Sequence, residues 1–223
     1  MIARIKNKIQ FSLFKLKIRS FSAVEKFSLF ANLNIEIKQN KKRLQPYYEH
    51  YIESVSRADM AASVELAAFM FSICKINQFT KVLDMGSGLS SFVFRLYAKE
   101  TSGVRVFSVD DDVEWLDKTK DFLRHYELDI DNIFTLDHFL KSDETKFDCI
   151  LHDLNFAEVR INYIEQLMSM VKSGGLVVFD DVHKPDYLFA LLKKLNGIRC
   201  TIFNLKPVTL DSYGRFSLVV LKH

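Results

Sequence analysis

From residue 81 to its C-terminus the sequence alternates short apolar segments with longer amphipathic ones, and this alternation constrains the fold more than any other feature. Such alternation is typical of a parallel sheet that helices cover on both faces. The segments that we expect to form strands are 81–85, 104–109, 133–136, 149–151, 176–179, 200–205 and 216–221. The fold class is therefore predicted to be α/β.

The segments between these strands carry helix signals. Ser56 with Asp59, three residues later, predicts the start of a helix over the Ala-rich stretch that follows. Asn155 with Glu158 predicts the start of another helix, which ends at the glycine pair 174–175. Further helices are expected over 90–98, 113–126 and 185–195.

The last two predicted strands, 200–205 and 216–221, have a turn at 211–214 between them but no helix. A parallel crossover needs about a dozen residues or more, usually including a helix, so these two strands are expected to pair antiparallel. We therefore predict a Rossmann-like, seven-stranded and mostly parallel sheet. It closes with an antiparallel hairpin and is preceded by an N-terminal helical extension.

Hydrophobic residues make up 48% of the chain, which is enough for one substantial core. Cys74, Cys149 and Cys200 are widely spaced, and each lies in an apolar stretch, as is typical of buried thiols. Their spacing fits neither a zinc site nor a disulfide framework, so we expect a reducing, cytoplasmic location. No apolar run is long enough to span a membrane, and lysines interrupt every apolar stretch near the N-terminus, so we expect no signal peptide.

Charge is distributed unevenly along the chain. Residues 1–43 carry eleven lysines and arginines against two glutamates, a net charge of +9, whereas the remainder carries −6. We therefore divide the chain into a basic helical extension, residues 1–55, and a main domain, residues 56–223. Basic residues without a recognisable binding module are a weak indication of nucleic acid, which we do not expect as a partner.

The first predicted helix has an apolar face on a helical wheel, composed of Ile2, Ile5, Ile9, Leu13 and Leu16. Lys6 and Lys17 lie at its edge, while Phe11, Phe14 and Ile18 fall elsewhere. Three interpretations are open. The helix docks on an anionic membrane surface, at the inner face of the membrane; it covers the substrate cleft of this subunit or of a partner in a homodimer; or it packs on the main domain with a solvated basic face.

The segment Asp84-Met85-Gly86-Ser87-Gly88 lies where the first predicted strand turns into its helix. Its two glycines let the backbone approach a ligand closely, and the helix N-terminus offers free N–H groups. Position 91 is a serine instead of the third glycine of the dinucleotide fingerprint, and the acid at position 84 would repel a pyrophosphate. That acid suits a ligand with a cationic amino group, such as the methionine part of S-adenosylmethionine.

Further acids follow the next two predicted strands. Asp110 is placed to accept hydrogen bonds from both ribose hydroxyls of a nucleoside, and the adjacent Asp111 leaves the register open by one residue. For these acids the alternative role is a helix N-cap, which Asp112 fits best. Asp137, after the third strand, either accepts a hydrogen bond from an adenine amino group or lies in a surface turn.

Together these features resemble the class I S-adenosylmethionine-dependent methyltransferase superfamily, over about residues 58–223. The resemblance rests on the loop in segment 82–91, the acidic end of the second strand and the closing hairpin. It implies a Rossmann-like methyltransferase fold. It also implies that S-adenosylmethionine is bound by Asp84, Gly86, Ser87, Gly88, Asp110, Asp111 and Asp137.

Within that superfamily the later motifs are similar to those of the cation-dependent O-methyltransferases that act on catechols and caffeoyl thioesters. Those enzymes place one metal-binding aspartate after the fourth strand and an Asp-Asn pair after the fifth. The corresponding residues here are Asp153 and the pair Asp180 and Asp181, with Asp in place of the usual Asn. Three converging carboxylates would repel one another without a cation, and oxygen ligands suit Mg²⁺, Ca²⁺ or Mn²⁺. The alternative is that Asp153 or Asp181 caps a helix.

The basic lysine of these enzymes, three residues beyond the first metal ligand, corresponds to Phe156 here. A different base is then required, and His183 and His152 are the candidates near the crevice. For each of them a structural role is the alternative. If His183 is the base, a mechanism without a metal becomes feasible.

We therefore expect a cytoplasmic enzyme that transfers a methyl group from S-adenosylmethionine to a hydroxyl of a small molecule or glycan, with or without a divalent cation such as Mg²⁺. One alternative is a non-catalytic, cofactor-binding scaffold that recruits partners through its basic arm, and another is an RNA methyltransferase. The Asn/Asp-Pro-Pro-aromatic motif of nucleic-acid amino-methyltransferases is absent. The equivalent stretch is His152-Asp153-Leu154-Asn155, which argues against N-methylation of bases.

Overall fold

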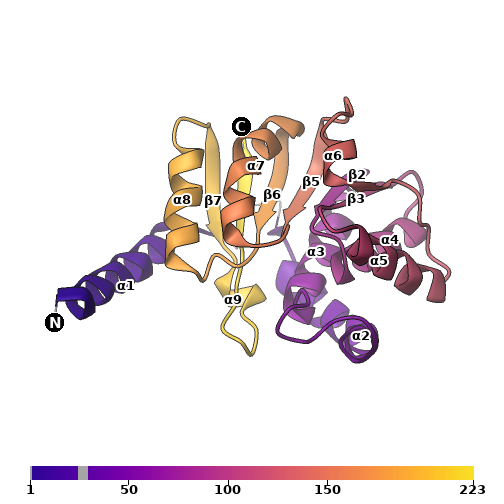
Figure 1. Ribbon diagram of the computed structural model, residues 1–223, viewed down its shortest axis with the longest axis horizontal. Coiled ribbons are helices and arrows are strands. Elements are labelled where there is room, and N and C mark those ends of the chain that lie inside the picture. Colours follow the sequence, from indigo (N-terminus) through magenta and orange to yellow (C-terminus); the bar gives the residue numbers. More distant parts are fainter. Residues whose placement is uncertain (1, 25–29) are drawn as a thin grey trace.

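The computed structural model describes residues 2–24 and 30–223, with the side chains of residues 10–24 and 30–223. An eight-stranded sheet with the order β1-β7-β8-β6-β5-β2-β3-β4 forms its centre (Figure 1). The strands are β1 (Ser22–Ala23), β2 (Lys81–Met85), β3 (Arg105–Asp110), β4 (Ile133–Thr135), β5 (Phe147–His152), β6 (Val171–Phe179), β7 (Cys200–Asn204) and β8 (Leu218–Lys222).

Helices cover both faces of the sheet. Successive strand residues point to opposite faces, so Val82 belongs to one core and Leu83 to the other. The described helices are α1 (Ile2–Ser20), α2 (Leu33–Ser54), α3 (Val64–Asn77), α4 (Leu89–Glu100), α5 (Val113–His125), α6 (Leu136–Phe139), α7 (Ala157–Met170), α8 (Pro185–Leu195) and α9 (Lys206–Thr209). Helices α2, α3, α4 and α5 contribute to the first core, and α1, α6, α7 and α8 contribute to the second.

The pairing of the strands confirms the predicted mostly parallel sheet. β2 lies in the interior and pairs in parallel with β3 and β5, and β6 continues the parallel set beside β5. β8 is antiparallel to both β6 and β7, which confirms the antiparallel pairing of the last two strands. The eighth strand, β1, pairs in parallel with β7 and lies in the region where the sequence predicts helices only. Two residues are too few to show an alternating strand pattern.

Two predicted helix starts need correction. Residues 57–62 form turns in which Asp59 pairs with Arg57, and α3 begins at Val64, where the Ser63 hydroxyl accepts a 3.1 Å hydrogen bond from the Leu66 amide. Helix α7 begins at Ala157 with no side-chain cap, because its cap position is occupied by Phe156; the Asn155 side chain, one residue earlier, accepts from the Phe156 amide and donates to Asp111. The predicted end of this helix also differs: Val171, expected within it, is the first residue of β6 and pairs with Phe147 of β5.

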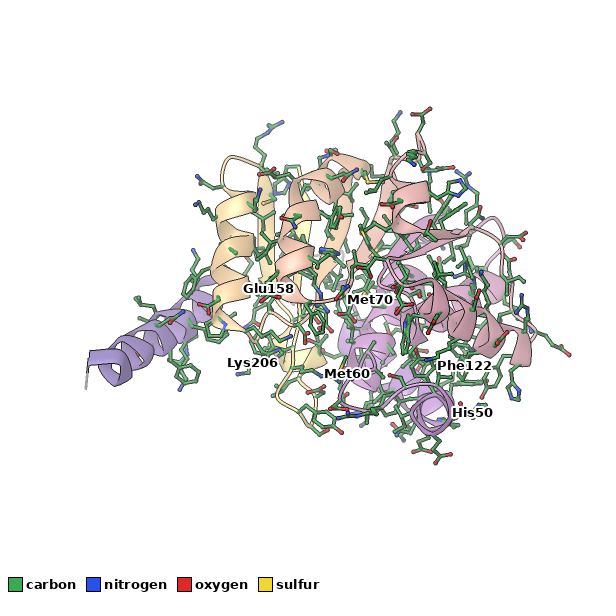
Figure 2. All side chains as sticks on the ribbon, viewed as in Figure 1. His50, Met60, Met70, Phe122, Glu158 and Lys206 are labelled. Atoms are coloured by element: carbon green, nitrogen blue, oxygen red, sulfur yellow. The ribbon has the colours of Figure 1, made fainter. Side chains whose placement is uncertain are left out.

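Aromatic side chains fix α2 against α4 and α5. The Nδ1 atom of His50 lies 2.6 Å from the hydroxyl oxygen of Tyr126, and the His50 ring lies 5.5 Å from that of Phe122. Figure 2 shows His50 and Phe122 close together at this contact. Tyr51, which is 1% exposed, packs edge-on against the same phenylalanine. Although α2 falls within the predicted extension, it therefore shares the core of the sheet.

Helix α1 packs against α8 and stands out from the rest of the molecule (Figure 1). Among its described side chains, Phe14 and Ile18 are buried, whereas Leu13 and Leu16 of the predicted apolar face are exposed. The other predicted members of that face, Ile2, Ile5 and Ile9, have side chains outside the described residues. No helix in the described part of the chain is long and apolar enough to cross a membrane.

Candidate active site

The carboxyl ends of β2, β3, β5 and β6 meet at one edge of the sheet, where ligands bind in open α/β folds. Backbone hydrogen bonds extend beyond the paired strands and tie these ends together. The Gly86 amide donates to the Val109 carbonyl over 2.9 Å, and the Asp153 amide donates to the Met85 carbonyl over 2.7 Å. The segments that follow the four strands are therefore held side by side.

The loop after β2 has a backbone that only glycine can adopt here. Gly86 has φ +112° and Gly88 has φ +145°, in the region that other residues rarely occupy. A Cβ atom at Gly86 would lie 2.4 Å from the carbonyl carbon of Asp153, and one at Gly88 would lie 2.7 Å from the hydroxyl oxygen of Tyr51. The loop is thus enclosed between the end of β5 and helix α2, although no feature of the sequence predicts that α2 lies beside it.

Asp84, in β2, is a buried carboxyl group with incomplete hydrogen bonding. One oxygen, Oδ2, accepts a 2.5 Å hydrogen bond from the Ser91 hydroxyl. The other, Oδ1, has no hydrogen-bond partner among the described residues and is inaccessible to solvent. Burial raises the pKa of Asp84 to about 7, although the hydroxyls of Ser91 and Ser90 oppose the rise. A buried oxygen without a donor at a ligand-binding edge is expected to receive a polar group from a ligand.

Asp110, the last residue of β3, shapes the same loop. Its Oδ2 atom accepts hydrogen bonds from the Ser87 amide at 2.7 Å and the Ser87 hydroxyl at 3.1 Å, while Oδ1 accepts from the Asp112 amide at 3.1 Å. Burial raises the pKa of Asp110 to about 6, and these donors oppose the rise. A carboxylate has about four lone-pair sites, so three donors leave capacity for one further hydrogen bond.

Ser87 is held by its other neighbours too, because the Trp115 indole donates a 2.7 Å hydrogen bond to the Ser87 carbonyl. Asp112 caps α5 by accepting from the Trp115 amide at 3.1 Å, which confirms the cap interpretation for that acid. Asp111 instead accepts a 2.6 Å hydrogen bond from the side chain of Asn155. The predicted strand 133–136 is one residue too long, because β4 ends at Thr135. Asp137 is exposed in the first turn of α6.

The aspartates after β5 and β6 lie around a buried arginine. The side chain of Arg160, in α7, is 6% exposed, and its guanidinium lies 2.6 Å from Asp153 Oδ1 and 3.6 Å from Asp181 Oδ2. The same guanidinium donates to the carbonyls of Leu154 and Asn155 at 2.9 and 2.8 Å. Two of the three predicted metal ligands therefore already have a cationic partner within the chain.

The third predicted ligand, Asp180, is also engaged, because its Oδ1 atom accepts a 2.6 Å hydrogen bond from the Ser217 hydroxyl. Burial raises the pKa of Asp180, and the neighbouring carboxylate of Asp181 adds to the rise. Burial acts against ionisation of Asp181 too. The positive charges of Lys184, at 2.8 Å, and of Arg160 outweigh this effect and lower the pKa of Asp181.

This arrangement does not fit a divalent cation. Among the described residues, no group of three His, Cys, Asp or Glu side chains is arranged to hold a metal ion. Three converging carboxylates require nearby positive charge, and Arg160 and Lys184 supply it within the chain. The signal for Arg160 in the sequence is its spacing of four residues from Ile164, which puts a charged residue on the apolar face of a helix.

The two candidate histidines have different surroundings. His152, at the end of β5, is fully buried, and its Nε2 atom lies 3.0 Å from the Arg160 carbonyl oxygen. Burial lowers the pKa of His152 to about 3. The side chain of His183 is 26% exposed, and its Nδ1 atom lies 3.5 Å from Asp181 Oδ1. Burial lowers the pKa of His183 below its usual value, so the ring is neutral at neutral pH.

No protein-family model matches this chain, and no curated protein matches it. Solved structures do share its architecture. The SAH-bound methyltransferase PaMTH1 from Podospora anserina has a TM-score of 0.61 at 15% identity, covering 81% of this chain and 87% of that chain. The O-methyltransferase from Bacillus cereus, in complex with SAH, has a TM-score of 0.59 at 14% identity, covering 82% and 89%.

A third similar structure is the O-methyltransferase TomG from Streptomyces achromogenes, involved in tomaymycin synthesis and solved in complex with SAM. Its TM-score is 0.58 at 16% identity, with 79% of this chain and 87% of that chain covered. Identities this low establish likeness of fold. The sheet order, with its antiparallel strand beside the fifth parallel one, and these three structures together show that the chain has the Rossmann-like fold of class I methyltransferases.

Proposed function

We propose that this protein is an S-adenosylmethionine-dependent methyltransferase that methylates a hydroxyl group of a small molecule or glycan. The observation that carries the proposal is the buried, unpartnered Oδ1 atom of Asp84 beside a glycine loop. A cationic amino group would supply the missing donor and favour the ionised carboxylate, which burial alone disfavours. The amino group of the methionine part of the cofactor has this character.

The residues of the loop fit the rest of such a cofactor. Gly86 and Gly88 have no side chains, so a ligand can approach the backbone of the loop closely. Asp110 retains one acceptor site at the position where a ribose hydroxyl is expected. Asp111 and Asp137 are exposed or bound elsewhere, so we assign them no central part in holding the cofactor. The bound cofactor supplies an electrophilic methyl group on a sulfonium.

On the acceptor side, His183 is our candidate base. Its Nδ1 atom faces Asp181, which leaves Nε2 to accept the proton of the acceptor hydroxyl. The lowered pKa keeps His183 neutral and able to accept that proton at neutral pH. The Asp181 carboxylate, 3.5 Å away, favours the imidazolium that forms. His152 is buried against the Arg160 carbonyl, so we assign it a structural part.

A hydroxyl acceptor is supported by the neutral imidazole at the crevice and by the resemblance to solved O-methyltransferases. No step in this scheme passes through a metal ion, because Asp153 and Asp181 are already paired with Arg160 and Lys184. Positioning of the acceptor oxygen and the methyl group in line is expected to supply most of the rate.

The test begins with calorimetric titration of the full chain with S-adenosylmethionine, followed by turnover with a panel of hydroxylated small molecules and sugars. We expect His183→Gln to retain cofactor affinity while turnover falls about 100-fold or more, the usual contribution of a general base. The matched control is His138→Gln, at an exposed histidine of α6, which should leave both unchanged.

Absence of cofactor binding would overturn the proposal. Tight cofactor binding with no turnover on any acceptor in the panel would favour a non-catalytic scaffold. Methylation of RNA, lost when residues 1–43 are removed and steeply dependent on salt, would assign the activity to nucleic acid instead.

A further inference from the structure

Helix α1 presents apolar side chains on the face turned away from the body of the protein. Of its described residues, Phe14 and Ile18 are buried in the core that faces the sheet. The Gln10 side chain donates a hydrogen bond to Asp186 of α8. Leu13 and Leu16, on the opposite face, are 54% and 63% exposed. The sequence continues this face at helical spacing through Ile9, Ile5 and Ile2, whose side chains lie outside the described residues.

The charges around this apolar face are all of one sign. Between Ile2 and Ser20 there are six lysines and arginines and no acidic residue. Lys15, Lys17 and Arg19 are exposed, and helical spacing puts Lys15 and Lys17 on opposite edges of the face that carries Leu16. Long basic side chains beside an apolar stripe can reach past it to a charged surface.

This combination favours one partner over the others. A second α1 would bring basic edges against basic edges, so self-association through this face is opposed by charge repulsion. An anionic lipid surface accepts the apolar stripe and pairs with the basic edges at the same time. We propose that α1 is an interfacial helix that docks the protein on an anionic lipid surface through Leu13 and Leu16.

Docking by α1 has a consequence for the crevice. The Phe14 ring lies 6.4 Å from that of Phe216, and the neighbouring Ser217 holds Asp180. Gln10 contacts the first turn of α8, directly after His183 and Lys184. The helix is therefore attached beside the acceptor half of the crevice, so docking brings that half to the lipid surface, where an acceptor carried by the membrane would be available.

The experiment is sedimentation of the full chain with vesicles of phosphatidylcholine alone and of phosphatidylcholine mixed with phosphatidylserine. It needs no methyl donor, so its outcome is independent of the proposed enzymatic activity. We expect binding to the mixed vesicles that weakens with salt, and little binding to the neutral ones. The double variant Leu13→Ser/Leu16→Ser should bind the mixed vesicles at least about tenfold more weakly.

Matched controls separate this surface from general properties of the chain. Ile35→Ser removes an equally exposed apolar residue, 60% exposed, from α2 and should bind as the wild type does. Lys15→Gln/Lys17→Gln should weaken binding, whereas Lys38→Gln/Lys42→Gln, at exposed positions of α2, should weaken it less. Each variant changes exposed side chains, so an unchanged melting temperature verifies folding.

Failure of the wild type to sediment with mixed vesicles would overturn the proposal, as would equal binding to neutral vesicles. A dimer in light scattering that is lost in Leu13→Ser/Leu16→Ser, together with absence of vesicle binding, would assign the face to a second copy of the chain and also overturn it.

Discussion

The two halves of the candidate site hold their carboxylates in different ways. In the cofactor half, Asp84 has a hydroxyl on one oxygen and no hydrogen-bond partner among the described residues on the other, and the buried Arg95 acts on it electrostatically without forming an ion pair. In the acceptor half, Asp153 and Asp181 are paired with Arg160 and Lys184. Both halves lie at the ends of adjacent strands of one sheet.

The difference distinguishes a carboxylate that is free to bind a ligand from carboxylates that form ion pairs within the fold. A carboxylate oxygen that is buried without a hydrogen-bond donor is costly, and it awaits a donor that arrives with the ligand. A buried carboxylate paired with arginine has its partner already, and removing that partner would expose the full cost of burial. Substitutions in the first half should therefore change binding, and those in the second half should change stability.

The largest effect is expected from Arg160→Gln. This change leaves the partly buried Asp153 and Asp181 beside each other without the buried guanidinium, and it also removes two hydrogen bonds to backbone carbonyls. The free energy of unfolding, measured by denaturant titration, should fall by about 3–5 kcal/mol, as is typical when one member of a buried pair is lost.

The control is Arg124→Gln, which removes an ion pair with Asp121 at the surface of α5, where the two side chains are 55% and 75% exposed. Solvent screens such a pair, and its loss should cost less than about 1 kcal/mol. Equal losses in the two variants would show that Arg160 does not neutralise the acceptor half in the way described.

Asp84→Asn should weaken cofactor binding and leave the stability of the fold largely unchanged. The neutral side chain keeps the shape of the carboxyl group but loses the charge that would receive the cofactor's amino group. Affinity for S-adenosylmethionine should fall about 10- to 100-fold, matching the roughly 1.5–3 kcal/mol of a hydrogen bond to a charged group. The folded pKa of Asp84, about 7, lies above its unfolded value, so its stabilising contribution is lost as pH rises through 7.

The free energy of unfolding of Asp84→Asn at pH 8 should therefore equal or exceed that of the wild type, because the variant has no charge to bury. A variant that binds the cofactor normally, or that unfolds far more easily than the wild type, would contradict the assignment of Asp84 to ligand binding.

A smaller, graded effect follows from the same pKa. Binding requires the ionised carboxylate and the protonated amino group of the cofactor, so wild-type affinity for S-adenosylmethionine should be highest between about pH 7 and 8 and weaken toward about tenfold per pH unit below pH 7. Calorimetric titration across this range gives the profile. Asp84→Asn should lack this step, and a wild-type profile as flat as that of the variant would show that Asp84 does not face the ligand.

The cofactor half could be predicted largely from the sequence because its signals are local. A strand, an acid and two glycines within one short segment determine the conformation of residues 81–88, and the predicted strand 81–85 is confirmed as β2. The helix over Pro185–Leu195 is likewise confirmed in full, because a proline in its first turn and the glycine that follows its end delimit it.

The arrangement of the acceptor half could not be predicted from the sequence, because its main contacts are made between separate elements. Arg160 reaches from helix α7 to Asp181, which follows strand β6 and is 21 residues away in the sequence. Periodicity reports which face of a helix is buried, but it does not report which residue that face meets. The carboxylates were visible in the sequence, and the spacing of Arg160 marked a charge on an apolar helix face, but nothing in the sequence indicated which acids it would meet.

The smallest effect, and the sharpest contrast between the halves, is expected from removal of divalent cations. In the wild type the guanidinium of Arg160 occupies the position between Asp153 and Asp181, so EDTA should change neither turnover nor the melting temperature. Arg160→Gln should differ, because its two bare carboxylates are oxygen ligands that suit Mg²⁺. Added Mg²⁺ should then raise the melting temperature of the variant and leave that of the wild type unchanged. Loss of wild-type turnover in EDTA, restored by Mg²⁺, would mean that a cation displaces Arg160, and both halves would then keep their charge for a ligand.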